Sequence, residues 1–202
     1  AAYWMMLLFS IVVTFQNVYA PLYLQRLHGT SPLYAGYLCA IPSFTWTITA
    51  ILVATLQGTK QTIAISAGVA LIFLGALGLA FTVVPGPVWL ITIFMSILGL
   101  GVGAMNNPTI QRAIQAAPES DRHIAGASVQ TMRTLGISFG AAASGLIAVS
   151  AGLNADTVPI EVLARAMSWV YGINVGFGVL TVLALIPFIA GYRRRMARGA
   201  AS

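Results

Sequence analysis

Long apolar runs constrain the fold of this chain more than any other feature of its sequence. A helix of about 20 apolar residues is long enough to cross the hydrocarbon core of a bilayer. Six such stretches are present, at residues 3–24, 34–56, 61–84, 88–110, 124–151 and 162–189. A transmembrane β-barrel would instead show alternating segments of about ten residues. The sequence therefore predicts an all-α membrane protein, with one bundle of six transmembrane helices over residues 1–202.

The composition agrees with a membrane location and excludes several kinds of site. Only 7% of the residues are charged and 58% are hydrophobic, whereas a soluble domain is about 25% charged. The single cysteine, Cys39, allows no internal disulfide, and His28 and His123 lack the spacing of metal ligands. The stretches contain no set of paired acids, nucleophile and base that an enzyme would need, and no ring of charges typical of a channel. We therefore expect no enzyme activity, no cofactor and no metal.

Three glycines in the fourth stretch invite comparison with a nucleotide-binding loop. Gly99, Gly101 and Gly103 do not follow the G-x-G-x-x-G order, and no strand precedes them. They also lie inside an apolar stretch that is long enough to cross the membrane. A nucleotide site is therefore not expected.

Basic residues gather on one side of the predicted membrane. With six spans, both termini share a side with the second and fourth connections. Seven Lys and Arg residues lie on that side: Lys60, Arg112, Arg122, Arg193, Arg194, Arg195 and Arg198. Only Arg26 and Arg165 lie on the other side. The positive-inside rule predicts cytoplasmic termini in a plasma membrane (the inner membrane of a bacterial cell), with residues 190–202 as a basic tail near lipid headgroups rather than a nucleic-acid site.

Small residues recur at a spacing of four in the last two stretches. Gly136 and Gly140 are followed by Ser144, and Gly172 and Gly176 repeat the pattern. This spacing puts each set on one helix face and lets a neighbouring backbone come close. We expect both faces to pack against other helices, and a role in sliding or rocking is the alternative.

Polar side chains in the first two stretches are candidates for a substrate path. Gln16 and Asn17 form a polar notch in an otherwise apolar helix, just before Pro21. Trp46 lies in the middle of the second stretch, away from the interfaces where Trp is commonest. The alternatives are a helix–helix hydrogen bond for the notch and core packing for Trp46.

Asn106 and Asn107 are further candidates near the end of the fourth stretch, immediately before Pro108. A proline leaves a carbonyl of the preceding turn without its hydrogen bond, and a nearby amide can satisfy that carbonyl. The two asparagines are therefore expected either to form a hinge or gate, or to stabilise the helix around the proline.

Arg133 is the only ionisable residue between Ile124 and Gly152, and Gln130 precedes it as a further candidate for the path. Charges inside a membrane are costly and commonly serve transport or packing. Arg133 lies about 13 Å from the start of its stretch at helical rise, so it could also extend to the cytoplasmic headgroups. A contact with another chain is a third possibility. None of the six stretches contains Asp or Glu, so no carboxylate within them neutralises this charge.

The stretch from Ile97 to Gly145 resembles the tenth and eleventh helices of the major facilitator superfamily, and most closely its fourteen-helix multidrug:proton antiporter branch. The resemblance rests on a Gly-rich helix ending in a proline, a connection with Pro118 and Arg122, and Arg133 placed three residues before Gly136. It implies the C-terminal half of a major facilitator fold. Between the second and third helices, however, LQGTKQT lacks the Asp and Arg of the Gly-x-x-x-Asp-Arg-x-Gly loop common in that family.

The resemblance implies half of a secondary active transporter that exports hydrophobic or cationic small molecules by alternating access. Its partners would be the small-molecule substrate, membrane lipid and an N-terminal half. Because the stretches here contain no carboxylate, any proton carrier is expected on that other half. The alternative is a complete six-helix protein, either a homodimeric transporter or a membrane scaffold without transport activity.

Overall fold

Six long helices make up the computed structural model, which describes residues 2–154 and 158–199, with side-chain environments up to residue 191. Their bounds are α1 (Ala2–Arg26), α2 (Pro32–Val53), α3 (Gly58–Thr82), α4 (Val88–Gln115), α5 (Arg122–Ser150) and α6 (Ile160–Gly199), with a short 3-10 turn, η1 (Glu119–Asp121), before α5. All six helices are long and apolar enough to cross a membrane. The predicted six-helix fold is confirmed.

The helices extend beyond the apolar stretches at several ends. Helix α4 continues to Gln115, five residues past the predicted limit at Ile110, so Arg112 is helical rather than in a loop. Helix α6 continues to Gly199, so most of the predicted tail, residues 190–202, extends this helix. The side chains of the four arginines in this tail lie outside the described residues. Hydropathy marks the part of a helix that lies in lipid, whereas the backbone ladder continues until a breaker such as Pro118 ends it.

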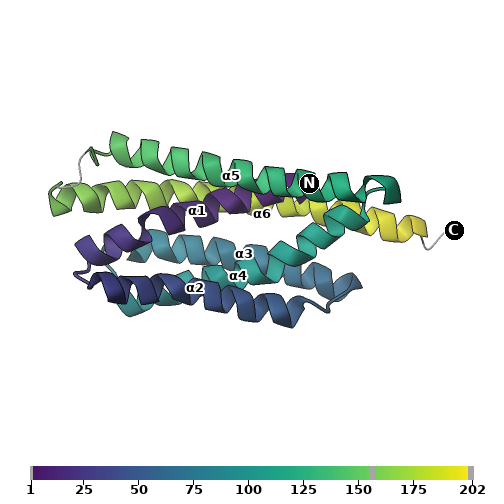
Figure 1. Ribbon diagram of the computed structural model, residues 1–202, viewed down its shortest axis with the longest axis horizontal. Coiled ribbons are helices and arrows are strands. Elements are labelled where there is room, and N and C mark those ends of the chain that lie inside the picture. Colours follow the sequence, from purple (N-terminus) through teal and green to yellow (C-terminus); the bar gives the residue numbers. More distant parts are fainter. Residues whose placement is uncertain (1, 155–157, 200–202) are drawn as a thin grey trace.

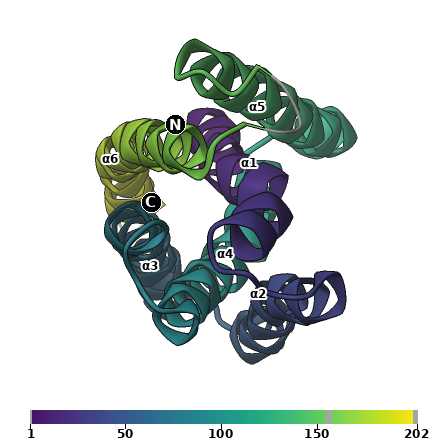
Figure 2. The same cartoon turned by 90° about the vertical axis from the view of Figure 1, so that its left-hand side faces the viewer.

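The helices run side by side along the long axis of the molecule (Figure 1). In the end-on view, α1, α4, α3 and α6 surround the centre, while α5 lies outside α1 and α2 lies outside α4 (Figure 2). The centre is filled by large buried side chains, including Phe15, Ile72, Met95 and Tyr171. About half of the most apolar segment is buried in α1, α3 and α4 (56%, 50% and 50%), but only 6% in α2, 22% in α5 and 17% in α6. Helices α2, α5 and α6 therefore leave most of their surface uncovered.

Glycines set the close contacts of α4 with both of its main neighbours. A Cβ atom added to Gly101 would lie 2.7 Å from the carbonyl oxygen of Gly68 on α3, and one added to Gly68 would lie 2.7 Å from the carbonyl oxygen of Gly101. On another face of α4, Gly99 meets the Pro42 carbonyl and Gly103 meets the Trp46 carbonyl, both on α2. The glycines that could suggest a nucleotide loop therefore allow α2 and α3 to approach α4.

A buried polar network joins α1, α4 and α6. The Tyr171 hydroxyl donates to Gln16 Oε1 (3.1 Å), and the Gln16 side-chain amide donates to the Tyr23 hydroxyl (3.4 Å). The Tyr23 hydroxyl in turn donates to the Met95 sulfur on α4 (3.6 Å). Asn174 adds a bond from α6 to the Val12 carbonyl of α1 (3.2 Å). These bonds satisfy polar groups that would otherwise be costly to bury, and they hold α6 in register with α1.

Replacing Tyr171 by phenylalanine is expected to lower the free energy of unfolding by about 1–2 kcal/mol, because the substitution leaves Gln16 Oε1 buried without its donor. Tyr37→Phe is the matched control, since Tyr37 is 65% exposed on α2. Unfolding in detergent, followed by the helical circular dichroism signal, would measure both variants. Equal stability of Tyr171→Phe and Tyr37→Phe would contradict a stabilising role for the network.

Candidate functional site

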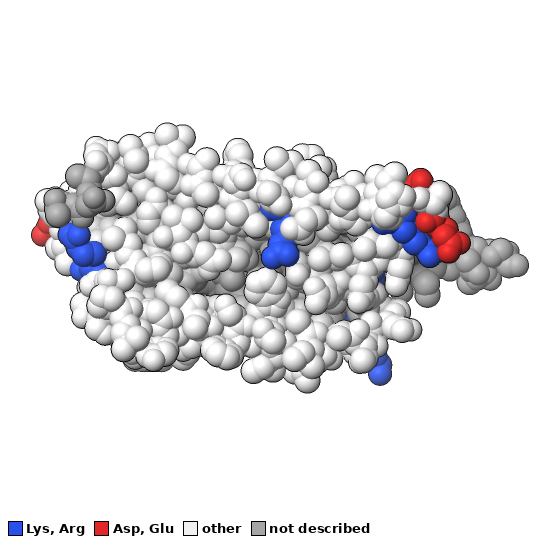
Figure 3. Space-filling model, viewed as in Figure 1, with Lys and Arg blue, Asp and Glu red and all other residues white. Residues whose placement is uncertain are grey.

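Helices α2 and α5 border a concave face whose floor is formed by α1 and α4. The side and end views agree on this arrangement, with α5 and α2 as the two projecting edges (Figures 1 and 2). In the space-filling view, a shallow hollow runs along this face, with Lys or Arg atoms at its middle as well as near both ends (Figure 3). Asp and Glu atoms are seen only near the ends (Figure 3). The face therefore combines a largely uncharged surface with a basic group near its middle (Figure 3).

Arg133 lies on this face and reaches across it to α2. Its guanidinium carbon is 5.8 Å from the ring centroid of Trp46, which is within the range of a cation–π contact. Arg133 is half-buried and makes no ion pair or hydrogen bond with another described residue. Arg133 is eleven residues into α5, about 16 Å from the helix start. The side chain is directed to Trp46 of α2.

Trp46 is held in place through its own backbone and its neighbour. Its carbonyl oxygen packs directly against Gly103 of α4. The hydroxyl of Thr45 donates to the Pro42 carbonyl (3.0 Å) and lies 3.2 Å from the Ser96 carbonyl of α4. The indole ring itself is half-buried. Trp46 therefore combines a fixed backbone with an accessible ring, which suits a surface that contacts a ligand.

The polar notch of α1 divides into one buried and one exposed residue. Gln16 is 1% exposed and belongs to the network with Tyr23 and Tyr171, so the structure corrects the expectation that it lines a path. It makes the helix–helix hydrogen bonds that were the alternative. Asn17, the next residue, is exposed. Successive residues of a helix differ by about 100° in direction, which explains why neighbours in the sequence have opposite environments.

The asparagine pair of α4 divides in the same way. Asn106 is 3% exposed, and its amide donates to Asn107 Oδ1 (3.3 Å). Its own Oδ1 is buried and has no hydrogen-bond partner in the described part of the chain. Neither side chain is bonded to a carbonyl freed by Pro108 among those residues, so the expected capping is not what the structure shows. Asn107 is exposed, as is Gln130 on α5.

The two glycine faces have different surroundings. A Cβ atom on Gly136 would meet the Leu7 carbonyl of α1, and one on Gly140 would lie 3.0 Å from the Thr14 Cβ and 3.1 Å from the Ile11 backbone. Nothing lies within 4 Å of a Cβ placed on Gly172 or Gly176. The first face therefore lies against α1, whereas the expectation that the second face packs within the bundle does not match the structure. Spacing alone shows that residues share a face, not which face is covered.

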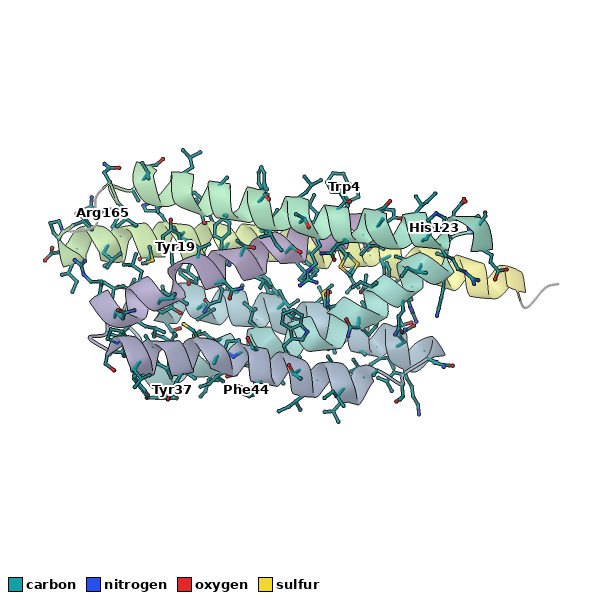
Figure 4. The ribbon with its side chains drawn as sticks, viewed as in Figure 1. Trp4, Tyr19, Tyr37, Phe44, His123 and Arg165 are labelled. Carbon is teal, nitrogen blue, oxygen red and sulfur yellow. The ribbon has the colours of Figure 1, made fainter. Side chains whose placement is uncertain are left out.

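Tyr19 adds a polar contact at the same junction of α1 and α5. Its hydroxyl donates to the Ser144 carbonyl (3.3 Å), and Ser144 follows Gly136 and Gly140 on the face of α5 that lies against α1. Figure 4 shows Tyr19 between these helices. The same figure places His123, at the start of α5, and Arg165, in α6, at opposite ends of the bundle (Figure 4).

Arg112 makes structural contacts that the sequence did not predict. The sequence marked it only as one of the basic residues on one side of the membrane. Its Nε donates to Gln61 Oε1 (2.7 Å), and its Nη2 donates to the Gly58 carbonyl (2.6 Å) and the Thr62 hydroxyl (2.8 Å). All three acceptors lie in the segment that reads LQGTKQT. This segment, most of which forms the start of α3, lacks an arginine of its own, and a guanidinium from α4 lies against it instead. No local signal reveals the contact, because Arg112 and Gln61 are 51 residues apart.

A metal centre is not formed by the residues that the structure describes, since no three His, Cys, Asp or Glu side chains gather there. The site instead consists of a membrane-depth guanidinium, an indole and an exposed amide on a concave apolar face. These groups can bind a molecule by stacking, hydrogen bonding and charge.

The fold and this face define a multi-pass helical membrane protein with one open, concave side. Residues 1–141 match the family model of the Major Facilitator Superfamily, and the chain belongs to this superfamily. It is similar to the riboflavin transporter RibZ of Clostridioides difficile (strain 630), with 26% identity over 125 residues. That match covers 60% of this chain and 27% of the relative, so the matched part of the chain corresponds to about a quarter of that protein. Family and relative point to a transporter rather than an enzyme.

Proposed function

We propose that this chain is one half of a secondary transporter for small molecules, and that the concave face between α2 and α5 is one wall of the substrate path. The observation that supports this most directly is the composition of the face. It presents Arg133, Trp46 and Asn107 at membrane depth, where lipid would penalise exposed polar groups. In transporters built from repeated halves, the substrate site lies near the midplane between the halves.

The proposed partner is a second six-helix half that covers α2 and α5. Only 6% of the apolar segment of α2 is buried. The side of α2 that faces Arg133 carries the indole of Trp46. A covering half would remove this side from lipid and enclose the hollow. A second copy of this chain is the alternative partner.

For the substrate, we propose a small, planar and largely apolar molecule. Trp46 offers an aromatic ring for stacking, and the similar protein from Clostridioides difficile is named as a transporter of riboflavin. We propose export as the direction, as in the multidrug antiporters that the sequence resembles. The fourteen-helix arrangement is part of the same proposal.

For coupling, we propose that any proton carrier lies outside this chain's membrane spans. Asp and Glu occur here only at four positions, Glu119, Asp121, Asp156 and Glu161, all in connections or at a helix start. Proton coupling at depth needs a group that changes charge there. We also propose a plasma-membrane location with cytoplasmic termini, supported by seven basic residues on one side against two on the other.

Cysteine labelling of the full-length protein tests the proposed path. In a background free of cysteine, including Cys39→Ser, Asn107→Cys is expected to react with a membrane-impermeant maleimide from either side of sealed vesicles. Leu74→Cys is the matched control, since Leu74 is 50% exposed in the middle of α3, a helix that does not border the concave face (Figure 2). We expect no reaction there because lipid excludes the reagent. Failure of Asn107→Cys to react from either side in folded protein would contradict the proposal.

A further inference from the structure

We propose that Arg133 and Trp46 together form a subsite for a planar aromatic anion, such as an aromatic carboxylate or sulfonate. This inference rests on the proposed function, because it assigns a substrate class to the same concave face. It also revises the expectation of cationic substrates, since a cation would meet a like charge at mid-depth.

The charge of Arg133 has no counter-ion on this chain within the membrane. No Asp or Glu occurs among the membrane-crossing residues of α1 to α5, and Glu161 lies in the first turn of α6. A guanidinium has five N–H donors in a planar fork that matches a carboxylate or sulfonate. No hydrogen bond from these donors to another described residue is present, and the guanidinium carbon lies 5.8 Å from the Trp46 ring centroid, a cation–π contact that uses no hydrogen-bond acceptor. The donor edge is therefore free to bind an anion.

The geometry also favours a flat ligand. Both the indole of Trp46 and the planar guanidinium of Arg133 are groups on which an aromatic ring can stack. Gly103 and Thr45 hold the backbone of Trp46 against α4, so the indole is presented from a rigid base. A ligand ring stacked on this pair would place an attached anionic group beside the donor edge of Arg133.

An exposed amide lies at about the same height. Ile114 of α4 is next to Gly126 of α5, with 3.5 Å from the Ile114 Cδ1 to a Cβ on Gly126. The two helices are joined by a short connection and run in opposite directions from it. Seven residues back along α4 is Asn107, and seven residues forward along α5 is Arg133. The exposed Asn107 is therefore placed to add a hydrogen bond to a ligand held by Arg133 and Trp46.

Three ligands of one size test the subsite in the purified full-length protein. Naphthalene-2-sulfonate is the anion, 2-naphthol the neutral compound and naphthalen-2-ylmethylammonium the cation. Isothermal titration calorimetry in detergent is expected to give the tightest binding for the anion and the weakest for the cation. Arg133→Leu should weaken binding of the anion at least tenfold and leave the neutral compound within about twofold, while Arg133→Lys should give an intermediate affinity for the anion because the charge is kept and the planar fork is lost.

Trp46→Leu should weaken binding of both the anion and the neutral compound, because both lose the stacking surface. Each variant is first checked for a monodisperse elution profile and native helix content. The inference is overturned if Arg133→Leu binds the anion as well as native protein does, if the cation binds best, or if native protein does not bind the anion. Pairing of Arg133 with an acid of the other half would produce the first or the last of these results.

Failure of the subsite and failure of the proposed path have different signatures. If Asn107→Cys is labelled from water but Arg133→Leu does not change the affinity for the anion, the concave face still lines the path and the assigned substrate class is wrong. If Asn107→Cys is not labelled, the path itself is placed wrongly, whatever the binding data show.

Discussion

Gly136→Ala is expected to lower the free energy of unfolding by about 1–3 kcal/mol, the usual cost of forcing an extra methyl group into a well-packed contact. The added Cβ would meet the carbonyl oxygen of Leu7 and lie 2.8 Å from the Ser10 Cβ. The first of these is a backbone atom, so α1 and α5 must separate to accommodate the methyl group. Thermal or SDS-induced unfolding of detergent-purified protein would measure the loss.

Gly145→Ala is the matched control in the same helix. A Cβ there has nothing within 4 Å, and alanine is favoured over glycine inside a helix by roughly 0.5–1 kcal/mol. We therefore expect the control to be as stable as the native protein or slightly more stable. A stability for Gly136→Ala equal to that of Gly145→Ala would show that the α1–α5 contact is looser than the structure indicates.

Gly101→Ala and Gly68→Ala are each expected to lower the free energy of unfolding by about 1–3 kcal/mol, because each Cβ would press on the other residue's carbonyl across the α3–α4 contact. Combining them should cost clearly less than the sum of the two single losses. Once one methyl group has separated the helices, room for the second already exists, and neighbouring sites couple in this way.

A double-mutant cycle on the detergent-purified protein measures this coupling. Gly36→Ala, on α2 with nothing within 4 Å of its Cβ, serves as the control for a helical glycine without a close neighbour. Strictly additive losses for Gly68→Ala and Gly101→Ala would mean that the two residues act at separate contacts.

The distribution of rigid and open surfaces bears on how such a half would work. The glycine contacts hold α2 and α3 against α4 and α5 against α1, and the network around Gln16 and Tyr171 ties α6 to α1, so the helices form one unit with a buried centre. Within this unit, α2, α5 and α6 present most of their outer sides. A rocking motion needs a body that moves as a whole, and the buried unit provides one.

For two pairs of adjacent polar residues, the sequence predicted a candidate site but not which residue of the pair is exposed. The sequence marks Gln16 and Asn17 as one polar notch, and Asn106 and Asn107 as one polar pair, but in each case one residue is buried and the other exposed. Which residue points inward depends on the rotation of the helix about its axis, and packing against other helices sets that rotation. The face made by Gly136 and Gly140 and the face made by Gly172 and Gly176 look alike for the same reason, although only the first meets another helix.

The sequence by itself determined the class of structure. Apolar runs longer than the hydrocarbon core and a shortage of charge leave a bundle of membrane helices as the outcome, because backbone polar groups in lipid must be satisfied within each helix. The tertiary structure alone decided which distant residues meet. Arg133 with Trp46, and Arg112 with the start of α3, come together across helices that are remote in the chain, because such contacts depend on how each helix is rotated and crossed against its neighbours.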